Sequence, residues 1–166
     1  MNLANPIQPR AESLARLAEE LSNTGIQEAR VQAALAAAGM EQNWQEVWNI
    51  ADLLGVEISL LFDSADNIWV DIGTAGSVRL QPPGGAILPF RLWVHTHPRD
   101  AYWSATDKRT LAIWQMLLDK ALVLGHDHYK QSVKGDATEL PRLSSAGPLA
   151  SWSDEEIVQY YEGVVE

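Results

Sequence analysis

Side chains able to bind a metal ion gather in the segment LWVHTHPRDAYWSATDK, residues 92–108. His95 and His97 stand two positions apart at the end of an apolar run, and Asp107 follows in the same segment. Side chains two positions apart on a strand point to the same face, so both imidazoles can reach one ion. The sequence contains no cysteine, so any transition metal must be held by histidine, aspartate or glutamate.

The elements around these residues determine what kind of site they form. The apolar run 86–96 predicts a central strand that Pro98 ends, and residues 104–120 predict a helix with Asp107 in its first turn. Two imidazoles and one carboxylate make three ligands and leave a fourth position for water, as in catalytic zinc sites. Bound zinc lowers the pKa of water towards about 7 and polarises a carbonyl group. The sequence therefore predicts one Zn²⁺ per chain.

These residues also carry a family resemblance. The run H-T-H-P, which contains His95 and His97, is followed by S-A-T-D, which begins at Ser104 and ends at Asp107. Together they resemble the signature H-S/T-H-P…S-x-x-D of the JAB1/MPN (JAMM) metallopeptidase family. The resemblance implies that the histidines and the aspartate bind zinc, and that the serine helps to stabilise a tetrahedral intermediate. Six residues separate His97 from Ser104, where the family usually has seven, but Ser104 and Asp107 keep their mutual spacing.

The family also uses an upstream glutamate as general acid and base on the zinc-bound water. Glu57 fits this role in the present sequence, because it follows the helix that closes at Gly55 and opens the predicted strand EISLLFDS. Glu46 is the alternative, but it lies in the middle of a predicted helix, where the resemblance is poorer. The resemblance extends over about residues 42–140.

Several of these residues have a structural interpretation as well. A serine followed three positions later by an acid is also a helix-capping pair, and Ser104 can fill both roles. A second H-x-H, formed by His126 and His128, has no S-x-x-D after it and is interpreted as a polar strand end, with substrate contact or a second metal as alternatives. Tyr102 and Trp103 are predicted to be exposed at the cleft, where they would bind an extended peptide substrate.

The remaining elements follow from periodicity and turn signals. The other predicted helices cover residues 9–22, 26–39, 43–55 and a C-terminal segment that begins at the capping box S-D-E-E of Ser153. The predicted strands cover residues 57–64, 67–73, 77–83, 86–96 and 121–133, and residues 140–151 are a predicted loop. The core is predicted to contain Trp44, Trp48, Trp69, Trp93 and Trp114.

Because several strands follow one another directly, the predicted fold class is α+β, an α/β sandwich. The resemblance implies a JAMM/MPN-like mixed sheet flanked by helices, with extra helices at the N-terminus. The predicted organisation is a helical extension over residues 1–40, a catalytic domain over 41–143, and a loop and C-terminal helix over 144–166 that pack on the same domain.

Composition restricts the location and partners of the chain. A net charge of −10 over 166 residues disfavours nucleic acid and anionic membranes as partners, since both attract a surplus of lysine and arginine. The sequence lacks a signal peptide pattern and an apolar stretch of about eighteen residues. We therefore expect a cytoplasmic protein.

The resemblance implies a zinc-dependent isopeptidase that hydrolyses the bond after the C-terminal glycine of ubiquitin or a ubiquitin-like protein. The tail of that modifier would lie as an added strand beside the sheet. Two alternatives stay open. One is a non-catalytic MPN scaffold for protein–protein contact, although such scaffolds have usually lost metal ligands. The other is a processing peptidase for a sulfur-carrier-type precursor.

Overall fold

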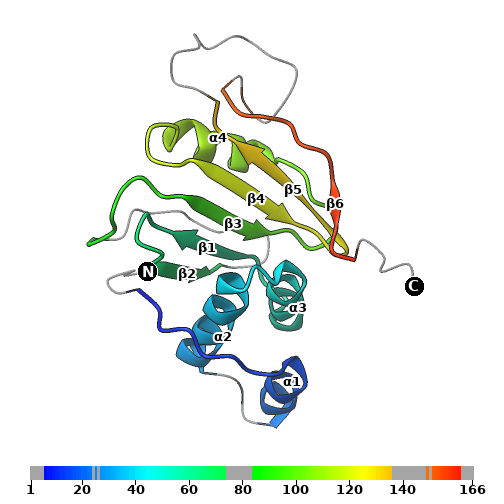
Figure 1. The fold of residues 1–166 in the computed structure, drawn as a ribbon. Helices are drawn as coiled ribbons and strands as arrows, with labels where there is room; N and C mark the ends of the chain where they lie inside the picture. The colour runs from blue at the N-terminus through cyan, green and yellow to red at the C-terminus, as the bar shows by residue number, and fades with distance from the viewer. Residues whose placement is uncertain are drawn as a thin grey trace.

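The computed structural model of the protein describes residues 6–23, 25, 27–73, 84–135, 149 and 151–161. Over these ranges the chain is an α+β fold with four helices and one six-stranded mixed sheet, which confirms the predicted fold class (Figure 1). The helices are α1 (Leu14–Asn23), α2 (Glu28–Met40), α3 (Trp44–Leu54) and α4 (Ala105–Ile113). The strands are β1 (Ile58–Phe62), β2 (Ile68–Ile72), β3 (Leu92–Thr96), β4 (Lys120–Leu124), β5 (His128–Val133) and β6 (Val158–Gln159).

The order of strands in the sheet is β2-β1-β3-β4-β5-β6. The strands β3 and β4 are parallel, whereas every other neighbouring pair is antiparallel. Parallel neighbours require a crossover connection, and here α4 lies in it. The chain that leaves the end of β3 therefore turns back into α4, which brings the first turn of this helix close to the last residues of β3.

The sheet separates two apolar cores. Helices α2 and α3 cover one face, with α1 packed against α3 on the same side, and α4 lies on the other side of the sheet (Figure 1). Along β3, Val94 belongs to the core under α1–α3, whereas Trp93 belongs to the core that contains Leu111 of α4. Because side chains alternate along a strand, His95 points to the α4 face together with Trp93.

The predicted tryptophan core is confirmed, because Trp44, Trp48, Trp69, Trp93 and Trp114 are all buried. Trp152, which the sequence did not single out, is buried as well. The predictions of β1, β2 and α3 are also confirmed. Helix α3 ends at Gly55, whose φ of +66° is left-handed and favours glycine.

Two predicted elements around α4 were too long. The strand predicted over 86–96 begins only at Leu92, because Pro89 has no N–H for a sheet ladder. The helix predicted over 104–120 ends at Ile113. Beyond it, Phe90 donates to Leu117 O at 2.7 Å and accepts from Asp119 N at 3.0 Å. Pairing with this extended segment replaces the last helical turns.

Two predictions in the C-terminal part were wrong. The single strand predicted over 121–133 is a hairpin, since β4 and β5 are separated by a turn in which Gly125 N donates to His128 O at 2.7 Å. Ser153 begins no helix within the described residues 151–161. Instead, its N–H donates to Val133 O and its Oγ accepts from Val133 N, both at 2.9 Å. The serine therefore pairs with β5 instead of capping a helix.

The predicted strand 77–83 and nearly all of the predicted loop 140–151 lie outside the described residues. Among the helices that the structure describes, none has the length and apolar character required to cross a membrane.

The outer edge of β2 is covered by segments from the N-terminal part of the chain. Ile7 N donates to Ile68 O at 2.7 Å, and Gln32 Nε2 of α2 donates to Val70 O at 3.4 Å. Two carbonyl groups on this edge strand therefore have partners from outside the sheet.

The contact between α2 and β1 depends on a glycine. A Cβ atom at Gly39 would lie 2.9 Å from Leu60 Cδ1 and 3.1 Å from Phe62 Cζ. Gly39→Val is therefore expected to lower the free energy of unfolding by about 1–3 kcal/mol through overpacking. Urea unfolding measures this change. Gly84→Val is the matched control, because nothing lies within 4 Å of a Cβ atom there. Equal losses in both variants would contradict the close packing.

Candidate metal centre

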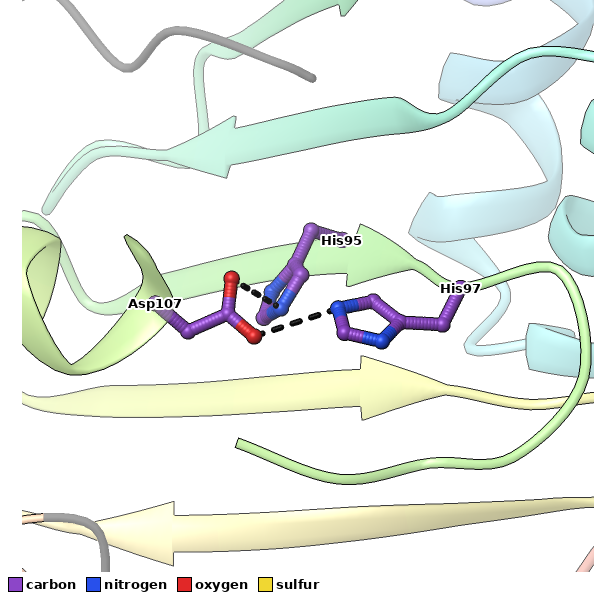
Figure 2. A group of neighbouring side chains, drawn as sticks. All are labelled: His95, His97 and Asp107. Carbon is purple, nitrogen blue, oxygen red and sulfur yellow. Dashed lines mark ion pairs between the residues drawn. The ribbon is translucent and has the colours of Figure 1, made fainter. Parts of the chain in front are cut away.

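The structure brings His95, His97 and Asp107 together. Figure 2 shows the imidazole of each histidine directed at a different oxygen of the carboxylate. Nε2 of His95 lies 3.1 Å from Asp107 Oδ1, and Nε2 of His97 lies 3.1 Å from Oδ2. All three side chains are buried, and their candidate ligand atoms lie within 4.8 Å of one another. The prediction that these three residues form one cluster is confirmed.

The arrangement fits a metal ion. Ligand atoms about 2.0–2.1 Å from a tetrahedral ion stand roughly 3.3 Å apart, close to the two nitrogen–oxygen separations observed here. Neither ring nitrogen of His95 has a hydrogen-bond partner, although Nε2 lies at ion-pair distance from the carboxylate. Buried polar atoms without partners are energetically unfavourable, and coordination of an ion by Nε2 would give this nitrogen a partner. The group could therefore hold a metal ion.

The charge of Asp107 is stabilised in this cluster. Burial by itself raises the pKa of its carboxyl group, but the nearby imidazoles of His95 and His97 outweigh this effect, and the N–H of Ser104 adds to theirs. The pKa is held well below its usual range. Asp107 is therefore a carboxylate at neutral pH, which is the form that binds a cation.

Aromatic rings fix the position of His95. The indole of Trp93 stacks on the imidazole with a centroid distance of 4.2 Å, and its Nε1 donates to Ser59 Oγ at 2.6 Å. The ring of Trp103 also lies near this imidazole, with a centroid distance of 5.9 Å. Trp103 is buried, so the prediction that it is exposed at the cleft was wrong: the apolar core under α4 takes up its ring. Tyr102 is exposed as predicted, at 57%.

Ser104 caps α4. Its Oγ accepts from Asp107 N at 3.1 Å, and its N–H donates to Asp107 Oδ2 at 2.9 Å, so both halves of a capping box are present. The structural interpretation of S-x-x-D is thus confirmed. Because the hydroxyl oxygen acts as acceptor in this pair, its own proton remains available to a further acceptor.

Glu57 lies next to the cluster. It precedes β1 and shares with His97 the wall of a cavity of about 220 Å³ beneath α3. Burial raises the pKa of its carboxyl group, and the charge of Asp107 acts in the same direction, whereas the imidazoles of His97 and His95 lower that pKa. The cavity that Glu57 shares with His97 connects this carboxyl group to the candidate metal centre.

The alternative glutamate lies elsewhere. Glu46, in the first turn of α3, lines a different cavity together with Glu12 and Ala38. The cavity that contains His97 includes Glu57 and not Glu46. Of these two glutamates, Glu57 is thus the one that lines a cavity together with a residue of the cluster.

The second H-x-H holds the loop between β3 and α4 in place. His126 N donates to Arg99 O at 2.7 Å, and Ala101 N donates to Nε2 of His128 at 3.0 Å. Because Nε2 accepts, the proton of the neutral ring is on Nδ1, which lies 2.6 Å from Asp127 Oδ1. The interpretation as a polar strand end is confirmed for His128, where β5 begins, whereas His126 lies in the turn between β4 and β5.

Three supporting residues were missed in the sequence. Trp48 Nε1 donates to His97 O at 2.8 Å and so anchors the second histidine to α3. Ser59 orients Trp93, as described above. Gly125 lets the β4–β5 turn approach the loop, since a Cβ atom there would lie 2.7 Å from Ala101 N. No local sequence signal indicated these three contacts, because each joins residues that lie far apart in the chain.

Comparisons of the chain with models of known protein families, with curated proteins and with solved structures gave no match. The functional interpretation therefore depends on the residues and geometry of this site.

The cluster predicts uptake of one divalent transition metal per chain. Titration of metal-free protein with Zn²⁺, followed by calorimetry, should give one equivalent. His95→Ala and Asp107→Asn should each weaken binding by more than about 100-fold, since losing even an outer-shell partner costs about 10–100-fold. His126→Ala removes an exposed histidine outside the cluster and should leave binding unchanged. Unaltered affinity in the two cluster variants would place the metal elsewhere.

The bond from Ala101 N to His128 predicts a stability effect. His128→Ala leaves this buried N–H without a partner and should lower the free energy of unfolding by about 1–3 kcal/mol. His128→Gln keeps a side-chain acceptor and should recover part of the loss. Thermal unfolding of the wild type and the two variants measures this effect. An alanine variant as stable as the wild type would show that the bond to Ala101 N does not stabilise the fold.

Proposed function

We propose that the protein is a zinc-dependent isopeptidase of the JAMM type, which hydrolyses the bond after the C-terminal glycine of a ubiquitin-like protein. One observation carries the proposal: Glu57, a half-buried carboxyl group with a raised pKa, shares a cavity with His97 at the edge of the His95–His97–Asp107 cluster. Structural ion pairs do not require a separate carboxyl group placed beside them, whereas proton transfer does.

Zinc held by the three cluster residues would supply Lewis acidity, lowering the pKa of a water molecule and polarising the substrate carbonyl. Two imidazole nitrogens and a carboxylate oxygen are ligands that suit this metal. The absence of cysteine leaves a histidine- and carboxylate-based site as the available form.

The role of Glu57 is to move one proton. It accepts a proton from the attacking water as the water oxygen forms a bond to the scissile carbonyl carbon. It then gives this proton to the leaving nitrogen as the carbon–nitrogen bond breaks. The products are a carboxylic acid and an amine, which ionise at neutral pH to a carboxylate and an ammonium group. A carboxyl group with a raised pKa suits both steps, because it binds the proton firmly enough to carry it and can still release it.

Two further residues complete the proposed site. The free hydroxyl proton of Ser104 can be donated to the developing oxyanion, next to the N-terminus of α4, whose dipole also favours negative charge. The ring of Tyr102 contacts His97 edge-on at a centroid distance of 4.7 Å and is exposed to solvent. Tyr102 is therefore the proposed aromatic contact for the peptide tail of the modifier. Trp103, which we expected beside it, supports His95 from within the core.

Glu57→Gln removes the proton carrier and keeps the shape of the side chain. We expect this variant to retain zinc and to lose about 10²–10⁴-fold in kcat. The assay uses zinc-loaded protein and a panel of ubiquitin-like proteins joined to lysine through their C-terminal glycine, with zinc measured by mass spectrometry. Glu46→Gln is the matched control and should retain full activity, because Glu46 lines a different cavity.

The same assay separates the alternatives. Full activity in Glu57→Gln would remove this residue from the mechanism. A zinc-loaded wild type that binds members of the panel without cleaving them would support the scaffold function instead. Cleavage restricted to sulfur-carrier-type precursors would identify a processing peptidase.

A further inference from the structure

The cavity beneath α3 has the size of a single side chain. Its volume is about 220 Å³, below the range of roughly 300–1,000 Å³ that is usual for small-molecule sites. Trp48, Ala51 and Val56 provide apolar walls, and Glu57 and His97 bring it to the candidate metal centre. Asp52, which is exposed, also borders it.

This cavity is poorly suited to a peptide group. The indole N–H of Trp48 already donates to His97 O at 2.8 Å, so a ligand carbonyl would find no free donor on that ring. The side chains of Ala51 and Val56 offer no polar atom, and the hydroxyl oxygen of Thr96, which also lines the cavity, already accepts from Ile58 N at 2.9 Å. Burying a peptide carbonyl against such walls without a hydrogen bond is unfavourable, whereas burying methylene groups is favourable.

The position of Glu57 indicates which half of a substrate enters the cavity. In the proposed function, on which this inference rests, Glu57 must touch the leaving nitrogen in order to protonate it. Since Glu57 is also part of the cavity wall, the group attached to that nitrogen extends into the cavity. The two carboxyl groups on the wall, Asp52 and Glu57, favour the ammonium form in which the amine is released.

We propose that this cavity binds the four-methylene chain of a lysine leaving group, and that it selects isopeptide bonds over linear peptide bonds. A lysine places only methylene groups between its Nε and its backbone. A linear peptide instead places a carbonyl carbon two bonds from the leaving nitrogen, against the apolar side chains of Ala51 and Val56. Val56, on the loop between α3 and β1, is thus a specificity-determining residue.

Leaving-group amines test this proposal without turnover. The probes are Nα-acetyl-lysine N-methylamide, its ornithine and diaminobutyrate homologues, and norleucine N-methylamide, which presents an α-amine. Binding to the full chain is followed by NMR of the Trp48 indole N–H. The lysine probe should bind most tightly, and each methylene removed should weaken binding about fourfold. Equal affinities across the series, tighter binding of the norleucine probe, or no binding of any probe would overturn the proposal.

Filling the cavity provides a second measurement. Val56→Trp should weaken binding of the lysine probe at least tenfold, whereas Val133→Trp, the same change at an exposed position on β5, should not. Wild-type affinity in a folded Val56→Trp variant would contradict the assignment. If that variant does not fold, as judged by circular dichroism, the chain-length series in the wild type decides alone.

The outcome is distinguishable from failure of the proposed function. In one outcome, the chain binds the probes with the expected dependence on length and yet cleaves no substrate when loaded with zinc. This result would exclude the isopeptidase function and support the binding of a lysine side chain in the cavity. Cleavage of linear fusions at the same rate as lysine conjugates would keep the peptidase function and exclude the selective cavity.

Discussion

The carboxylate of Asp107 is the group on which the site depends. A buried carboxylate is tolerated only when its charge is compensated, and Asp107 meets a different group at each oxygen. One of these oxygens also accepts the N–H of Ser104. The same side chain thus completes the cap of α4 and faces both imidazoles. Any change that moves the start of α4 would therefore also move a candidate metal ligand, which couples folding of the helix to formation of the site.

The residues of this cluster were readable from the sequence because each depends on a local rule. Because side chains alternate along a strand, His95 and His97 point to the same face, and a capping pair places Asp107 in the first turn of a helix. Glu57 was singled out through the family resemblance, and the end of α3 beside Gly55 places it just before β1. Signals of this kind act within a few residues, and they held here in β1, β2 and α3.

The wrong predictions have a common physical cause. Ser153 and the acids after it form a good local capping signal, but its backbone and hydroxyl group bind Val133 instead. The end of the helix predicted over 104–120 was likewise replaced by pairing with Phe90. Burial of Trp103 depends on α4 and the sheet closing over it. In each case a contact between distant parts of the chain outweighed a local preference. Such long-range contacts cannot be predicted from the local patterns of a single sequence.

The two H-x-H pairs show how similar sequence patterns acquire different tasks. His95 has ring nitrogens without hydrogen-bond partners, whereas His128 has a partner at each nitrogen, Ala101 N and Asp127 Oδ1. A histidine whose two nitrogens are both engaged is poorly placed to bind a metal. The second pair instead binds the six-residue loop that links the two parts of the candidate centre, through Arg99 O and Ala101 N.

The cover over the edge of β2 bears on how the protein behaves in concentrated solution. An exposed edge strand offers unpaired N–H and carbonyl groups to other chains and so promotes intermolecular β-pairing. Here Ile7 and Gln32 occupy carbonyl groups along β2 that would otherwise attract a second molecule. Trimming the segment before α1 to obtain a smaller fragment would bare part of this edge and favour self-association. The segment around Ile7 therefore contributes to the edge of the sheet, even though it lies outside the described helices and strands.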